Sequence, residues 1–152
     1  GRLTVKQSSD SSGGAFRLER NANTNNWHLI VATTNDLYLD YNAGDKGYFS
    51  NSTGAYTPVS DSRVKKNIEP CRYGLVEILN LRPVEYNMLE EADSDLKHLG
   101  FLAQDALKVI PSSVSVMQSG IYGMDKTEII PAVVKAIQEL AAKVTALEAA
   151  NG

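Results

Sequence analysis

The sequence predicts an α+β chain built from two modules. Residues 1–59 are expected to form the end of a fibrous, intertwined β-structure, and residues 60–152 a small α+β domain that ends in a long helix. Three observations predict this division. Apolar residues alternate with polar ones in the first module, composition changes near residue 60, and apolar residues recur at heptad spacing near the end of the chain.

The first module has the pattern of short strands with one buried face. Its alternating apolar residues are Leu3 and Val5, Phe16 and Leu18, Trp27, Leu29 and Val31, and Leu37, Leu39 and Tyr41. Segments 8–14, 21–26, 42–47 and 51–54 have turn composition. Because 25 of the first 59 residues are Gly, Ser, Thr or Asn, the module cannot build a large core alone. Identical copies of the chain are the expected neighbours, and a small β-meander packed on the C-terminal part is the alternative.

The second module mixes short helices and strands. A helix is predicted over 73–81, with Leu75, Ile78 and Leu79 on one face, and Arg82-Pro83 ends it. A second helix over 104–109 ends before Pro111. Strands are predicted over 84–88, 98–103, 114–117 and 121–124, with a solvated loop over 89–97 and a turn at Ser119-Gly120.

A long helix is predicted over about 126–150. Its heptad positions a are Ile130, Ile137 and Val144, and its positions d are Val133, Leu140 and Leu147. This choice of side chains favours two strands over three in a parallel coiled coil. The alternative is one helix packed on its own domain.

Composition excludes several classes of function. The formal charge of −3 lies in residues 60–152, which hold 10 Lys and Arg against 13 Asp and Glu, and no basic block predicts a nucleic-acid partner. No apolar run approaches a membrane span. The first residue is Gly1, which suggests a fragment or a trimmed chain. The single cysteine, Cys71, predicts a reducing compartment and a buried apolar role.

Other candidate sites are interpreted as structural. His28 and His98 are far apart and have no acidic partner nearby in sequence, which argues against a Ser-His-Asp site. The acidic residues Glu90, Glu91, Asp93 and Asp95 lack the glycine and terminal glutamate of a calcium loop. Gly13-Gly14 is followed by no lysine at phosphate-loop spacing. We therefore expect no metal, no cofactor and no small-molecule substrate.

The run Ser60 to Ile68 is the strongest functional signal. It places a serine and a lysine five residues apart, and such a pair cuts amides without histidine, cysteine or metal. A lysine near its reference pKa of about 10.4 is protonated at neutral pH, so burial or the positive charges of Arg63 and Lys66 must help Lys65 to act as a base. On one helix Ser60 and Lys65 would lie about 140° apart. The run must therefore bend at Ser60, or the lysine must come from another subunit.

This run resembles the signature S-D-x-R-x-K-x-N-I of the peptidase S74 family, the C-terminal intramolecular chaperone domains of bacteriophage tail spikes, tail fibres and neck appendages. Four further stretches resemble the family in the same order: 79–86, 100–105, 110–114 and 129–140. The resemblance implies a homotrimer that folds an upstream triple β-helix and then releases itself. It implies Ser60 as nucleophile, Lys65 as its partner and a cut between Val59 and Ser60. Asp61 and Asn67 match the motif, and we expect them to form turns or to donate oxyanion-side hydrogen bonds, with the turn role favoured.

The same resemblance implies where the protein acts and with what. Its partners are other copies of the chain and the upstream β-helical fibre. Assembly takes place in the host cytoplasm, and the N-terminal product stays in the virion tail or fibre. A permanent, non-cleaving trimerisation and attachment module is the main alternative, and a peptidase that acts on other proteins is the third.

Overall fold

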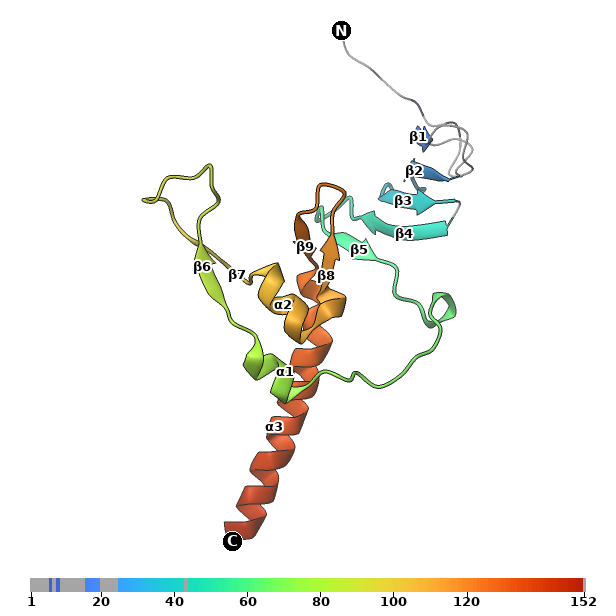
Figure 1. The fold of residues 1–152 in the computed structure, drawn as a ribbon. Coiled ribbons are helices and arrows are strands. Elements are labelled where there is room, and N and C mark those ends of the chain that lie inside the picture. The colour runs from blue at the N-terminus through green and yellow to red at the C-terminus, as the bar shows by residue number, and fades with distance from the viewer. Residues whose placement is uncertain (1–5, 7, 9–15, 20–24, 43, 152) are drawn as a thin grey trace. The chain divides into compact units, whose positions relative to one another are not determined.

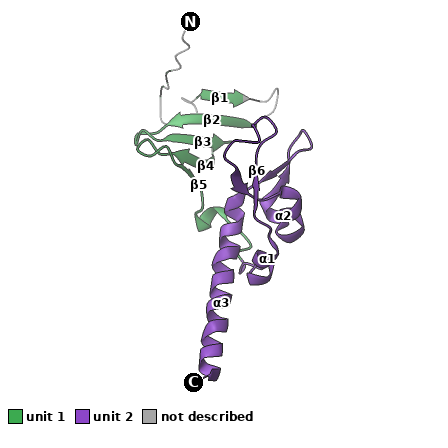
Figure 2. Ribbon diagram, turned by 90° about the vertical axis from the view of Figure 1, so that its left-hand side faces the viewer, with its two compact units in different colours: residues 1–68 green, residues 69–152 purple. Residues whose placement is uncertain are grey.

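The computed structural model describes residues 6, 8, 16–19, 25–42 and 44–151. They fall into two compact units, residues 1–68 and residues 69–152, which Figure 2 colours separately. The fold is α+β, with a β-sheet and a long C-terminal helix (Figure 1), which confirms the predicted class. The intertwined and homotrimeric parts of the prediction concern several copies of the chain and stay predictions, as does the module boundary at residues 59–60.

The first unit contains a five-stranded antiparallel sheet in which each strand pairs with the next along the chain. The strands are β1 (Phe16–Glu19), β2 (Asn26–Val31), β3 (Leu37–Tyr41), β4 (Gly44–Phe49) and β5 (Tyr56–Pro58). The predicted strands at Phe16, Trp27 and Leu37 are confirmed. The strand expected at Leu3 and Val5 and most of the turns at 8–14 and 21–26 lie outside the described residues.

The turn predicted over 42–47 is wrong, because β4 already begins at Gly44. Asn42 has a φ of 53°, which lets the chain reverse in a short turn. The residues that follow are then free to pair with β3, and Tyr41 lies opposite Gly44. The turn predicted over 51–54 is confirmed, and Gly54 has a φ of 71° within it.

The alternating apolar residues of this sheet do share one face, but in the single chain they are half-buried or exposed and none is buried. Leu18 and Trp27 are cross-strand partners and are 54% and 46% exposed. The buried side chains of the sheet lie on the opposite face: His28, Ile30 and Asp40. The described part of this unit forms a single sheet without a second layer over that face, so the expected burial of this apolar stripe against identical copies of the chain stays a prediction.

The second unit combines helices with two short hairpins. Its helices and turns are α1 (Leu75–Asn80), α2 (Ala103–Val109), η3 (Pro111–Ser113), η4 (Lys126–Ile129) and α3 (Ile130–Asn151). Its strands are β6 (Val84–Tyr86), β7 (His98–Gly100), β8 (Val114–Val116) and β9 (Tyr122–Met124), paired as β6–β7 and β8–β9. The predicted helices, strands and helix-ending prolines are confirmed, with ends shifted by a few residues. Leu79 is a correction: it is 75% exposed, whereas Leu75 and Ile78 are half-buried.

The long helix α3 packs on its own unit through alanines rather than through its heptad residues. Ala132 and Ala136 are buried, and α3 lies against α1 (Figure 1). The six heptad residues are all exposed: Ile130, Val133, Ile137, Leu140, Val144 and Leu147. The alternative of a helix packed on its own domain holds for the alanine face only. The heptad seam has no partner within the part of the chain that the structure describes.

Candidate active site

The Val59–Ser60 peptide follows directly from the last strand of the sheet. Val59 N donates a hydrogen bond to Lys46 O at 3.1 Å, and the hydroxyl of Tyr56 donates to the same carbonyl at 3.1 Å. These bonds extend the pairing of β5 with β4 by one residue. This role of Lys46 could not be predicted from its residue type, since its carbonyl is used and not its side chain. The residue on the N-terminal side of the expected cut is therefore held by the sheet.

A tight turn then brings Ser60 and Lys65 together. The 3₁₀ turn η2 (Ser62–Val64) is preceded by Asp61 in an extended conformation and followed by Lys65, also extended. Lys65 Nζ donates a hydrogen bond to Ser60 Oγ at 2.8 Å. The contact forms within one chain, and the backbone at its start is non-helical, as the spacing argument required.

Asp61 and Arg63 stabilise this turn. Asp61 Oδ1 accepts hydrogen bonds from Arg63 N at 2.7 Å and from Arg63 Nε at 3.0 Å, and Asp61 Oδ2 accepts from Arg63 Nη2 at 2.8 Å. The Arg63 side chain is thus paired with a carboxylate, which offsets its charge and weakens its expected influence on Lys65. Asn67 has a φ of 53°, a conformation that asparagine adopts more readily than most residues. Both motif residues Asp61 and Asn67 lie where the backbone turns.

The pairing makes the turn sensitive to acid. The side chain and then the backbone N–H of Arg63 hold the pKa of Asp61 below its ordinary value of 3.8. Because the pKa is lowered, the carboxylate contribution is present above that ordinary value and is lost as pH falls through the lower, folded value. An NMR titration of the Asp61 carboxyl should show its midpoint below 3.8. The midpoint should rise in Arg63→Ala and stay unchanged in Lys66→Ala, and an equal midpoint in wild type and Arg63→Ala would contradict the pairing.

The site is open to solvent in a single chain. Every residue from Ser60 to Pro70 is exposed. Ser60 also lines an open groove of ≈ 840 Å³ within the first unit, together with Gly44, Asp45, Lys46, Val59, Asp61, Arg63 and Val64. Burial, which disfavours the charged form of a lysine, is therefore not supplied to Lys65 by its own chain.

Both histidines have acidic neighbours, contrary to the sequence-based expectation. His98 Nε2 lies 2.8 Å from Glu91 Oε1, and this contact is the main cause that lowers the pKa of Glu91. His28 lies opposite Asp40 in the sheet, and burial raises the pKa of Asp40. Neither pair contains a serine, so the argument against a Ser-His-Asp site stands on different grounds.

The remaining candidates have structural roles. Glu91 also accepts a hydrogen bond from Met88 N and Asp95 accepts one from Ala92 N, so these acidic side chains stabilise their own loop. Across the described ranges, no three His, Cys, Asp or Glu side chains are gathered as metal ligands would be. Cys71 is half-buried rather than buried and donates to Tyr73 O. None of the helices in the described ranges has the length and apolar character that a membrane crossing needs.

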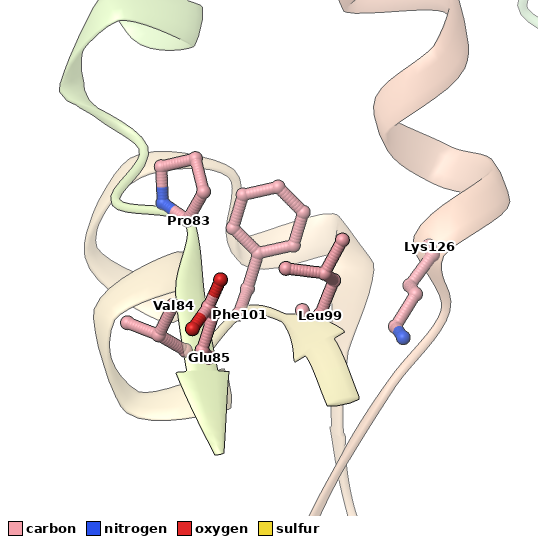
Figure 3. A pocket seen from close by; sticks show the side chains of 7 residues that line it. Pro83, Val84, Glu85, Leu99, Phe101 and Lys126 are labelled. Carbon is pink, nitrogen blue, oxygen red and sulfur yellow. The ribbon is translucent and has the colours of Figure 1, made fainter. Parts of the chain in front are cut away.

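A second cavity, of ≈ 460 Å³, lies in the second unit between the β6–β7 hairpin and the start of η4. Figure 3 shows its apolar side chains Pro83, Phe101 and Leu99, with Lys126 on the other side of the cavity. Glu85 is the other charged residue that lines it. No serine, cysteine or histidine lines this cavity, so it offers no nucleophile for amide cleavage.

Comparison with known families adds an independent observation. Residues 60–115 match the family model Peptidase_S74, described as the chaperone of endosialidase. This segment is similar to the peptidase S74 family. The comparisons with curated proteins and with solved structures give no match.

The peptidase S74 match begins at Ser60 and ends in β8. It therefore includes the Ser60–Lys65 contact and three of the four further stretches that resembled the family, and it stops before α3. A chaperone-of-endosialidase segment indicates an intramolecular chaperone role for this chain.

Proposed function

We propose that this chain is an intramolecular chaperone that trimerises and folds the upstream triple β-helix of a phage tail spike or fibre, and then releases itself by cutting between Val59 and Ser60. The observation that carries the proposal is the 2.8 Å hydrogen bond between Lys65 Nζ and Ser60 Oγ, at the first residues of a peptidase S74 segment. The family match supports the chaperone role, and the contact supports the cleavage.

The proposed chemistry starts with an attack by Ser60 on the peptide bond that precedes it. Ser60 Oγ, Cβ, Cα and N together with the carbonyl carbon of Val59 form a five-membered ring when Oγ bonds to that carbon. Lys65 in its neutral form accepts the hydroxyl proton as the new C–O bond forms. The tetrahedral intermediate collapses with cleavage of the C–N bond, and Lys65 returns the proton to the nitrogen of Ser60. The product is an ester between Val59 and Ser60 with a free amine.

A water molecule then hydrolyses this ester. The water oxygen bonds to the carbonyl carbon of Val59, and the C–O bond to Ser60 breaks. The Ser60 hydroxyl is regenerated and Val59 becomes the C-terminal carboxylate of the released fibre. One water is consumed, and no metal or redox partner is needed to balance the reaction.

Assembly is proposed to activate the site. In a single chain Lys65 is exposed to water, and its Nζ donates a hydrogen bond to Ser60 Oγ. Neighbouring copies that cover residues 60–65 would remove water from the lysine and favour its neutral form. Two apolar surfaces support such an assembly: the heptad seam of α3 and the exposed face of the five-stranded sheet. Cleavage then follows correct association and does not precede it.

The direct test is intact-mass analysis of the expressed chain, with N-terminal sequencing of its fragments. Wild type should yield fragments 1–59 and 60–152, and Ser60→Ala should stay whole, because the alanine has no hydroxyl to attack the peptide bond. Ser62→Ala is the matched control, since Ser62 is an equally exposed serine in the same turn and should leave the cut unchanged. A new N-terminus at any residue other than Ser60 would contradict the proposal.

A permanent trimerisation module is the second candidate. It is favoured by the Asp61–Arg63 pairing, which gives part of the motif a structural role without any cleavage. A trimeric wild-type protein that remains uncut would support it.

A peptidase that acts on other proteins is distinguished by measuring the cleavage rate after dilution, because cutting within an assembled trimer has a rate independent of trimer concentration.

A further inference from the structure

The inner face of α3 holds the backbone that follows the Ser60–Lys65 run. Glu139 Oε2 accepts a hydrogen bond from Leu75 N at 2.9 Å, and Lys135 Nζ donates to Cys71 O at 2.7 Å. The two side chains also face each other, with 3.6 Å between Lys135 Nζ and Glu139 Oε1. We call Lys135 and Glu139 the α3 clamp. Both contacts link residues 64 positions apart in the chain, so they are tertiary contacts and not local turns.

The sequence around Gly74 is fitted to this clamp. A Cβ atom at Gly74 would lie 2.6 Å from Glu139 Oε1, so a larger residue there would have to displace the carboxylate of Glu139 from its present position. Gly74 has a φ of −148° and a ψ of −143°, which is outside the β and α regions of the backbone. Glu77 Oε2 accepts from Gly74 N at 2.8 Å. The amide of the N-cap Gly74 and the first amide of the six-residue helix α1, that of Leu75, are thus each satisfied by a carboxylate, and a helix this short depends on such partners.

The clamp lies on one side of a two-sided helix. Its residues share the buried face with Ala132 and Ala136, at helical spacings of three and four. The heptad seam lies on the exposed surface of the same helix. The same helix therefore has an exposed seam that other copies could contact and an inner face that binds its own chain.

We propose that Lys135 and Glu139 are positioning residues for cleavage of the Val59–Ser60 bond. Only residues 66–70 separate Lys65 from the clamped segment, so the clamp fixes one end of the chain that carries Ser60 and Lys65. Association of the α3 seams then places that end in register with the assembly. The inference rests on the proposed function, since it assigns these residues a part in the same reaction. They touch neither reacting atom, and they act through the backbone at Cys71 and Leu75.

The kinetic test measures the first-order rate of cleavage in the assembled fraction. Glu139→Ala and Gly74→Ala should each slow cleavage by about 10- to 100-fold at an unchanged oligomeric state, as expected when reacting groups are misplaced. Glu139→Gln keeps an oxygen that accepts from Leu75 N and should stay within about threefold of wild type. Glu148→Ala and Lys143→Ala are matched controls on exposed positions of the same helix and should cleave at the wild-type rate.

A second measurement separates this inference from the proposed function. In the uncleaved Ser60→Ala background, hydrogen exchange should accelerate about tenfold or more in Glu139→Ala at the Leu75 amide and also at the amides of Val64 and Lys65, which the turn protects. If exchange accelerates at Leu75 but not at Val64 and Lys65, the α3 clamp stabilises only the residues it contacts, and the inference is overturned. Unaltered cleavage in assembled Glu139→Ala would overturn it as well. If wild type does not cleave, the proposed function fails. The exchange at Val64 and Lys65 still shows whether the α3 clamp stabilises the turn that carries Lys65.

Discussion

Cleavage between Val59 and Ser60 should be lost when Lys65 is replaced by alanine. The lysine is the side chain whose nitrogen lies 2.8 Å from Ser60 Oγ, and a serine hydroxyl attacks an amide only when a base takes its proton. Removal of a general base slows such a step by about 10²–10⁴-fold. Over the hours of an expression culture this loss is expected to leave the chain intact. Denaturing gels and intact masses of wild type and Lys65→Ala, prepared in parallel, measure it.

Two further substitutions test whether Lys65 acts as the base. Lys65→Arg keeps a donor and a positive charge, but a guanidinium stays protonated and cannot act as a base, so this variant should also stay whole. Lys66→Ala removes the neighbouring exposed lysine and should cleave as wild type does. If Lys65→Arg cuts at the wild-type rate, the lysine only orients Ser60, and another group must accept the proton.

The local parts of this fold could be predicted from the sequence because they follow local rules. Pro83 and Pro111 lack the amide that a helix needs, so they set the ends of α1 and α2. The five-residue spacing between Ser60 and Lys65 predicted either a bend at Ser60 or a lysine from another subunit, and the structure has the bend. The contact itself depends on the turn at residues 62–64, whose cap by Asp61 is a common use of that residue type.

Features that depend on distant or repeated chains could not be predicted in the same way. Strand β4 contains Gly44, Asp45 and Lys46, which have turn composition, and its extended form comes from pairing with β3. The sequence correctly grouped the apolar residues of the sheet on one face. Whether that face is covered depends on other copies of the chain, and a single sequence does not show how copies associate. Lys135 and Glu139 are spaced like the alanines Ala132 and Ala136 on one face of α3. Their partners are backbone atoms of Cys71 and Leu75, and a pattern of side chains cannot predict a contact with backbone atoms.

Replacement of Ile137 by lysine should abolish assembly and, with it, cleavage. Ile137 is 62% exposed in the single chain, so a lysine there costs that chain little. At the centre of a helical seam the same lysine would be buried beside its own copies, where an unpaired charge costs several kcal/mol. Light scattering in the Ser60→Ala background should therefore give the trimer mass for the parent and the monomer mass for the Ile137→Lys variant. A dimer in the parent would contradict the triple β-helix interpretation and agree with the heptad pattern alone.

Gln138→Lys is the control, since Gln138 is the next residue on α3, is exposed, and lies outside the seam. It adds the same charge to the same helix and should leave both the trimer and the cut unchanged. The informative comparison is the cleavage of Ile137→Lys with an intact Ser60 and Lys65. If this monomer still cuts itself at the wild-type rate, assembly does not activate Lys65. If it stays whole while its second unit retains native helical content, the uncut state is a consequence of the exposed, hydrated lysine, because the two reacting residues and their turn are unaltered.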